Sequence, residues 1–146
     1  MIWRIISNVW FSVIINGVPQ GFFKSSHGLR QGDPISPMLF VISAEVLSHL
    51  LNSLGSGFMP FRVPPSCPTF THLAYADDVI IFTSGLKRSV QLVKKALEGY
   101  ALVSGQKVNQ QKSCVVTHAN FPRVRRRSIT KITGFQIKEF PVRYLG

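Results

Sequence analysis

The chain has 146 residues, 45% of them hydrophobic and 16% charged, so it is long enough for one packed core and too apolar for a disordered segment. Seventeen Lys and Arg against six Asp and Glu give a formal net charge of +11, which indicates a polyanionic partner such as nucleic acid rather than a small neutral substrate. No apolar run approaches the ~18 residues of a membrane-spanning helix, and two cysteines and four histidines form neither a disulfide framework nor a metal-ligand pattern.

The first third of the sequence predicts a β-hairpin followed by a loop. Residues 10–15 and 21–24 are rich in β-branched and aromatic side chains, and Asn16-Gly17 between them is a tight-turn pair. Residues 28–34 contain two glycines and a proline, which excludes the interior of a helix or a strand.

A long helix is predicted next. Ser36 is expected to be its N-cap, with Pro37 in the first helical position, where the missing N–H costs nothing. Apolar residues then recur at steps of three and four, namely Leu39, Ile42, Val46, Leu50 and Leu54. Gly55 is expected to end the helix, and four prolines within residues 55–69 exclude regular structure there.

A second hairpin and a second helix are predicted after that excursion. Two β-rich runs, residues 70–75 and 79–83, flank Ala76-Asp77-Asp78 and place the two acids at a hairpin tip. The helix is expected over about residues 89–103, because its apolar residues share one face and Gly105 follows as a C-terminal stop.

The last third of the chain gives weaker signals. Residues 107–109 and 114–117 are short strand candidates, and residues 123–127 are basic. Residues 135–145 indicate the start of a third hairpin.

The adjacent acids carry the clearest chemistry. Carboxylates next to each other at a hairpin tip repel, so Asp77 and Asp78 imply either a bound cation or a well-solvated turn. In a chain with six acids and a net charge of +11, the pair suits a divalent metal held beside a phosphate substrate. Mg²⁺ typically takes one or two protein carboxylates and completes its shell with phosphate oxygens and water.

Four motifs also carry a family resemblance. Tyr75-Ala76-Asp77-Asp78 is similar to the signature hairpin of reverse transcriptases, and residues 28–37 resemble the preceding loop and helix start in polymerases of non-LTR retrotransposons. Residues 104–113 resemble the family's next block, and Tyr144-Leu145-Gly146 resembles the hairpin that supports the primer end. Order and spacing agree from about Asn16 to the last residue.

The resemblance implies the two-metal mechanism of nucleotidyl transfer, in which two divalent ions about 4 Å apart activate the primer 3′-hydroxyl and stabilise the departing pyrophosphate. It makes Asp77 a direct ligand of Mg²⁺ (or Mn²⁺) and Asp78 a weaker or indirect one. Gln31 and Gly32 would lie along the nucleotide and the template, and Arg30 would contact phosphate unless it is simply a solvated arginine.

Three further residues have competing interpretations. Lys112 matches the family block after the second helix and is either the general acid to the leaving pyrophosphate or a surface lysine. The Tyr75 side chain either contacts the nucleotide and template or packs beneath the hairpin, and packing is the preferred expectation. Asp33 is expected to fix the loop through a side-chain hydrogen bond rather than to bind metal.

The sequence departs from the family pattern in one respect. The family carries a further aspartate, upstream of the Asn16-Gly17 hairpin, that bridges both metals, whereas residues 1–32 contain no Asp or Glu. Without that ligand the rate is expected to fall by many orders of magnitude. The chain is therefore expected to be a fragment or a decayed copy, to bind metal weakly, and to be nearly inactive alone.

A basic cluster lies further on. Its members are Arg123, Arg125, Arg126 and Arg127, together with Lys131. The cluster is either a surface that follows a nucleic-acid backbone or a solvated loop.

Together these features predict one partial domain over residues 1–146, with an α+β fold: a polymerase palm-like antiparallel sheet with helices packed on one face, without fingers or thumb. The expected partners are an RNA template, a DNA primer, dNTPs and the remaining polymerase segments, with no membrane, in the nucleus or cytoplasm rather than outside the cell. The mean hydropathy of +0.18 predicts a surface partly covered by other protein. Two other hypotheses are a non-catalytic basic nucleic-acid-binding module and a non-functional retroelement relic.

Overall fold

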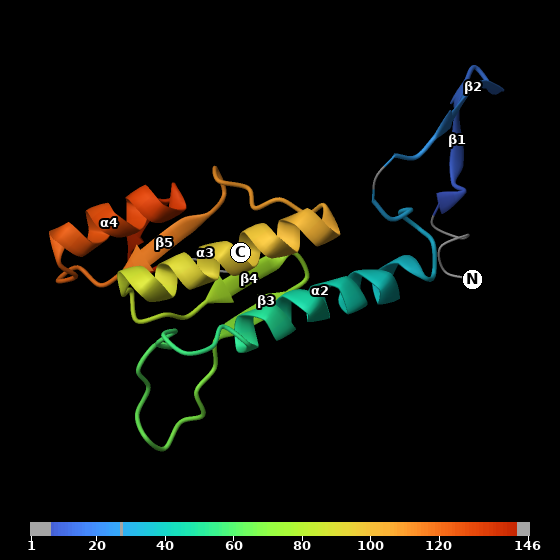
Figure 1. Ribbon diagram of the computed structural model, residues 1–146. Helices are drawn as coiled ribbons and strands as arrows, with labels where there is room; N and C mark the ends of the chain where they lie inside the picture. The colour runs from blue at the N-terminus through green and yellow to red at the C-terminus, as the bar shows by residue number, and fades with distance from the viewer. Residues whose placement is uncertain (1–6, 27, 143–146) are drawn as a thin grey trace. The chain divides into compact units, whose positions relative to one another are not determined.

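The computed structural model describes residues 7–26 and 28–142 (Figure 1). Within this part the elements follow the order β1, β2, α2, β3, β4, α3, β5, α4, β6, which confirms the α+β class. The strands form three separate two-stranded sheets instead of the single antiparallel sheet that was predicted. The chain divides into two compact units, Met1–Ala44 and Glu45–Gly146, and each is described by itself.

The described part of the first unit contains the predicted hairpin. Strands β1 (Trp10–Ile15) and β2 (Val18–Lys24) are antiparallel, and Asn16 and Gly17 both have the positive φ that a tight two-residue hairpin turn requires. Rings stack across the strands: the Trp10 and Phe22 centroids are 5.4 Å apart. Strand β2 begins three residues earlier than predicted because an edge strand tolerates a proline, here residue 19.

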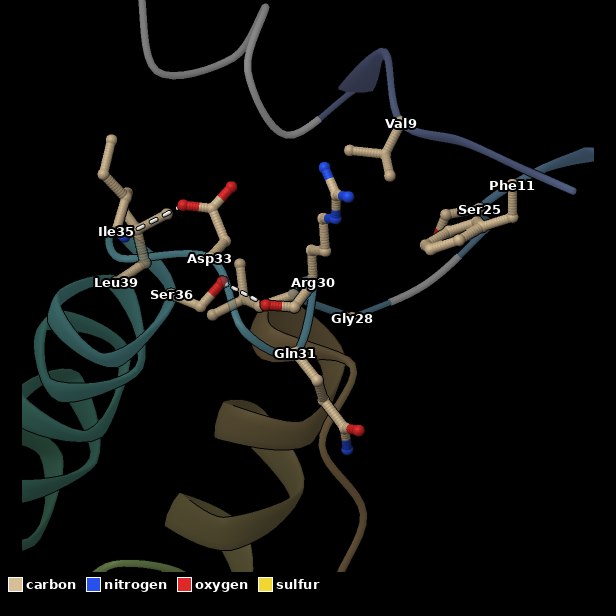
Figure 2. A pocket seen from close by; sticks show the side chains of 11 residues that line it. Val9, Phe11, Ser25, Gly28, Arg30, Gln31, Asp33, Ile35, Ser36 and Leu39 are labelled. Atoms are coloured by element: carbon tan, nitrogen blue, oxygen red, sulfur yellow. Dashed lines mark hydrogen bonds between the residues drawn. The ribbon is translucent and has the colours of Figure 1, made fainter.

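The start of helix α2 (Ser36–Asn52) corrects the predicted cap. The Asp33 carboxylate accepts a hydrogen bond from the Ile35 N–H at 3.0 Å (Figure 2), and the Asp33 carbonyl accepts one from the Ser36 N–H at 3.0 Å. Ser36 is therefore not the N-cap; its hydroxyl donates to the Arg30 carbonyl at 2.6 Å. Asp33 and Pro34 instead belong to the turn that leads into the helix, and the expectation that Asp33 fixes the loop through a side-chain hydrogen bond is confirmed.

The second unit contains the predicted acidic hairpin. Strands β3 (His72–Tyr75) and β4 (Asp78–Ile81) pair antiparallel, and Tyr75 and Asp78 form the last pair before the turn. The base of the hairpin is attached to the end of α2, because the Thr71 hydroxyl donates to the Asn52 side-chain oxygen at 2.7 Å. These contacts leave the tip as the free end of the hairpin.

Helix α3 (Lys87–Ser104) ends at Gly105, which is left-handed as predicted. Its buried Ser89 hydroxyl accepts the Met59 N–H at 3.0 Å, so the proline-rich excursion before the hairpin is attached to α3 at that point. The excursion itself contains no helix or strand, as expected. Four apolar residues are buried in the described part of the chain, namely Leu51, Val90, Tyr100 and Ile129.

The end of the second unit is a β-α-β crossover. Strands β5 (Cys114–Thr117) and β6 (Gln136–Glu139) pair in parallel, and α4 (Arg123–Thr133) connects them and packs beside α3 (Figure 1). The basic cluster is therefore helical and not a loop. A parallel partner for β6 was not predicted. Any returning strand at 143–145, and the Tyr144-Leu145-Gly146 motif, lie outside the described residues.

One predicted strand is wrong. Residues 107–109 have no strand partner in the described part of the chain. The Asn109 side-chain oxygen instead accepts hydrogen bonds from the N–H groups of Gln111 and Lys112 at 3.0 and 3.2 Å. An asparagine that binds its own following backbone in this way favours a turn over an extended strand.

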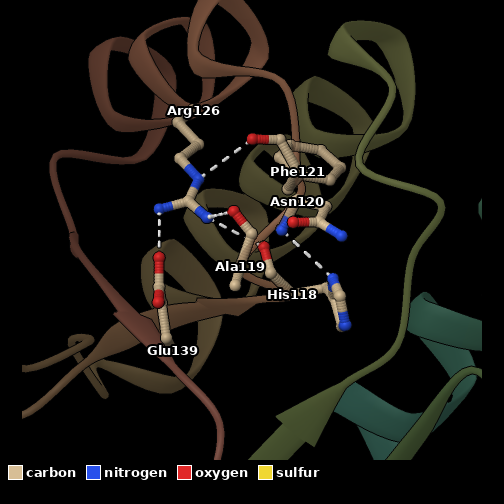
Figure 3. A network of polar contacts seen from close by, with 6 residues as sticks. All are labelled: His118, Ala119, Asn120, Phe121, Arg126 and Glu139. Carbon is tan, nitrogen blue, oxygen red and sulfur yellow. Dashed lines mark hydrogen bonds and ion pairs between the residues drawn. The ribbon is translucent and has the colours of Figure 1, made fainter.

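Arg126 joins the parts of the crossover (Figure 3). Its guanidinium donates to the Glu139 carboxylate at 2.6 Å, to the carbonyls of His118 and Ala119 at 2.8 Å, and to the Phe121 carbonyl at 3.2 Å. The side chain is 22% exposed, so water screens these charge-assisted bonds less than it screens a surface pair. One side chain thus links α4 to β6 and to the loop after β5.

Much apolar surface remains exposed. Phe22 is 75% exposed, Met38 67% and Leu102 88%, whereas isolated domains seldom expose large contiguous apolar patches. This exposure favours the expectation that other protein covers part of the surface. Across the described residues, no helix combines the length and the apolar character needed to cross a bilayer.

We predict that Arg126→Met lowers the free energy of unfolding by about 2 kcal/mol, because four hydrogen bonds made by a side chain that is only 22% exposed are lost. Arg127→Met is the matched control. The Arg127 side chain is exposed and has no partner in the described residues, so its loss should change the free energy of unfolding by no more than about 0.5 kcal/mol. Urea unfolding, monitored by circular dichroism, measures the free energy of unfolding of both variants. Equal changes in the two variants would show that the network does not stabilise the fold.

Candidate metal and nucleic-acid site

The acidic tip is a strained two-residue turn. Ala76 and Asp77 are its central residues, and Ala76 has a φ of 50°. An L-residue in this left-handed region places its Cβ close to the following carbonyl, which costs roughly 1–2 kcal/mol. Sequence reasoning assigned no role to Ala76, although a two-residue link between paired strands signals a positive φ.

The two carboxylates of the tip are the chain's unengaged acids. Asp77 and Asp78 are exposed, and neither carboxylate has a hydrogen-bond or ion-pair partner among the described residues. The other four acids are all engaged. Asp33 accepts a backbone N–H, Glu45 pairs with His49, Glu98 with Lys94 and Glu139 with Arg126.

The tip fits a divalent cation as part of a site. Mg²⁺ accepts one or two carboxylates if phosphate oxygens and water supply the rest, and the tip offers two exposed carboxylates with nothing else bound to them. The described part of the chain contains no group of three or more His, Cys, Asp or Glu side chains suited to a metal ion. The tip therefore supplies an incomplete site that a phosphate-bearing ligand would have to complete.

Tyr75 does not pack beneath the hairpin. The residue is 64% exposed, although its backbone pairs with Asp78 in the ladder. The preferred expectation for this residue is therefore wrong, and the ring is free to contact a ligand near the tip.

The loop of the first unit lies beside a hollow of about 520 Å³ (Figure 2). The end of the hairpin, the loop and the first turns of α2 line it, including Val9, Phe11, Arg30, Gln31, Asp33 and Leu39. The Arg30 and Gln31 side chains are exposed and point in different directions. Gly32 has a φ of 83°, a conformation that glycine adopts without strain.

The remaining predicted site residues lie in the second unit. Lys112 is exposed, and its ammonium group pairs with no acid in the described residues, the two aspartates included. Arg123, Arg125 and Arg127 are exposed as well. Arg126 differs from them, because its guanidinium is occupied by Glu139 and three carbonyls.

The 104–113 block has a structural role that the sequence did not reveal. The Tyr100 hydroxyl donates to the Gln106 side-chain oxygen at 3.1 Å, and the Gln106 N–H donates to the Ser104 hydroxyl at 3.1 Å. With the left-handed Gly105 between them, these contacts close the end of α3. The block thus fixes where the chain turns before Lys112.

Comparisons with known proteins give one matching family and two relatives. The family described as "Reverse transcriptase (RNA-dependent DNA polymerase)" matches residues 1–146. An uncharacterized mitochondrial protein of Arabidopsis thaliana is 45% identical over 75 residues, which are 50% of this chain and 62% of that protein. The retrovirus-related Pol polyprotein from type-1 retrotransposable element R2 of Popillia japonica is 30% identical over 76 residues, 52% of this chain and 12% of the polyprotein. The matched part spans less than two thirds of either relative.

We predict that Ala76→Gly raises the free energy of unfolding by about 1 kcal/mol, because glycine adopts the positive φ of the turn without steric cost. Ala74→Gly is the control in the same hairpin: Ala74 lies in β3 opposite Val79, where glycine is expected to destabilise by roughly 0.5 kcal/mol. Thermal unfolding of both variants shows whether each substitution by glycine raises or lowers the stability. Destabilisation by both substitutions would contradict the strained turn.

Proposed function

The chain belongs to the reverse transcriptase family, and from this premise we propose that Asp77 and Asp78 supply part of the divalent-metal site of an RNA-directed DNA polymerase. The observation that carries the proposal is the pair of unengaged carboxylates, since every other acid in the chain has a partner. The paired strands hold both residues in place, since Asp77 lies in the two-residue turn and Asp78 begins β4 opposite Tyr75.

Each residue predicted to contact metal, nucleotide or template has a part in this proposal. Asp77 and Asp78 bind the divalent ion, which supplies a positive centre for the phosphate oxygens of the nucleotide. Arg30 offers an unpaired cation to a phosphate, while Gln31 and Gly32 contact nucleotide and template. Lys112 donates a proton to the leaving pyrophosphate, and the exposed Tyr75 contacts the nucleotide or template near the tip.

The substrates follow from the same proposal. An RNA template, a DNA primer and dNTPs carry the negative charge that a chain of net charge +11 attracts. We further propose a retrotransposon origin of the non-LTR type, which the similarity to the Pol polyprotein of the R2 element supports.

A second candidate function is a non-catalytic nucleic-acid-binding module. The exposed cations of α4 favour it, because they have no acid partner in the described residues. The two candidates differ in their need for metal. The polymerase function requires an ion at the acidic tip, and the binding module does not.

We predict that Mn²⁺ binds at the tip. Added to the isotope-labelled chain, the paramagnetic ion should broaden the amide NMR signals around residues 75–80 first. Asp77→Asn combined with Asp78→Asn should weaken this effect at least roughly tenfold, because both carboxylate ligands are lost. The control is Glu98→Gln combined with Asp33→Asn. This variant changes the net charge by the same amount and should leave the Mn²⁺ broadening at residues 75–80 unchanged. Unchanged broadening in the tip variant would rule out the proposed site.

A further prediction concerns the isolated 146-residue chain. With Mg²⁺, dNTPs and a DNA primer annealed to an RNA template, it should extend the primer no faster than the chain with both tip aspartates replaced. The reason is that two carboxylates alone hold two ions poorly, and no third acid joins them in the described residues. Mg²⁺-dependent extension that disappears in Asp77→Asn would contradict this.

A further inference from the structure

The basic cluster of α4 is divided by the direction in which its side chains point. Arg126 points into the crossover, where it binds Glu139 and three backbone carbonyls (Figure 3). Residues four apart lie on one side of a helix, so Arg123, Arg127 and Lys131 form a single row. All three are exposed, and their Cα atoms follow one another at about 6 Å along the axis. We call this row the α4 stripe.

The α4 stripe is not neutralised within the described part of the protein. None of its three cations has an acid partner there, and Glu139, the one acid of the crossover, is bound to Arg126. Like charges four residues apart destabilise a helix, and the first turn of α4 contains no acid to compensate. The stripe therefore reduces the stability of its own helix and would be relieved by an external anion.

The surroundings of the stripe distinguish between two kinds of anionic partner. A helix that lies on an anionic membrane needs a free apolar face beside its cations. In α4, Ile129 is buried and Ile132 is half-buried against the rest of the unit, and Val124 is the one large apolar side chain that faces solvent. A membrane surface is therefore disfavoured, whereas a phosphate backbone requires only a regular series of cations.

We propose that the α4 stripe, Arg123, Arg127 and Lys131, binds the sugar–phosphate backbone of a nucleic acid at a place separate from the acidic tip. The inference rests on the proposed function in that it takes nucleic acid as the ligand, but it requires neither metal nor catalysis. Arg126 is excluded from the surface because four of its five N–H donors are engaged within the fold, and Arg125 is excluded because it lines a different hollow, beside Lys87 and Ser128.

The test compares two triple variants with the same net charge. Arg123→Gln, Arg127→Gln and Lys131→Gln remove the stripe; Lys24→Gln, Arg62→Gln and Lys95→Gln remove three exposed cations from other parts of the chain. The probe is a fluorescein-labelled single-stranded RNA, and its anisotropy is measured over a range of NaCl concentrations in EDTA. Circular dichroism checks that each variant keeps its helix content.

In the stripe variant, the slope of log affinity against log salt concentration should become shallower by about 2. Its affinity for RNA in ~0.1 M salt should fall roughly 30-fold or more. The control variant should change both quantities much less. If the stripe variant loses helix content, the three single substitutions replace it, and each should reduce the slope by about 0.7.

Two results would overturn the proposal. One is an equal loss of affinity in the two triple variants, which would indicate diffuse attraction by net charge. The other is stripe-dependent binding to phosphatidylserine vesicles without stripe-dependent binding to RNA. The chain with both tip aspartates replaced should bind RNA in EDTA like the unmodified chain, so a failed metal site and a failed α4 stripe give different results.

Discussion

The shortage of negative charge constrains the whole structure. Six carboxylates serve a chain that has seventeen Lys and Arg, and four of the six accept a backbone N–H or pair with a basic side chain. The Arg126 pair does the most for the fold, because it connects α4 with β6 through a partly buried side chain. The two acids that remain are adjacent and at the end of a hairpin, where an external cation can reach them.

The same imbalance explains the distribution of the basic residues. A cation bound inside the fold, such as Arg126, contributes to stability, whereas a cation without a partner contributes mainly to the field around the molecule. In the described residues, the two unpaired carboxylates lie at the end of a hairpin, and unpaired cations lie on α4. Both suit a polymerase family whose ligands are nucleic acids and nucleoside triphosphates.

Local patterns predicted most of the fold. Asn16-Gly17, the flanks of the acid pair and Gly105 each fix their neighbours through short-range geometry, so both hairpins and the end of α3 were predicted correctly. The cap of α2 was misassigned because serine is a good capping residue, and only the hydrogen bonds show that the Ser36 hydroxyl binds the Arg30 carbonyl instead. The parallel pairing of β5 and β6 joins strands separated by a helix, and no local pattern encodes such a contact. The acid pair was found from the sequence, but the different roles of Arg126 and its neighbours depend on tertiary contacts.

The division into three two-stranded sheets has a consequence for how the chain behaves in solution. In a two-stranded sheet both strands are edge strands. The backbone N–H and C=O groups on their outer edges pair with no other strand of the described chain. Such edges accept a further strand from any chain that presents one, and apolar edges do so most readily. The β1–β2 hairpin combines open edges with exposed aromatic rings, so crowding of the molecules would favour strand exchange and self-association there first.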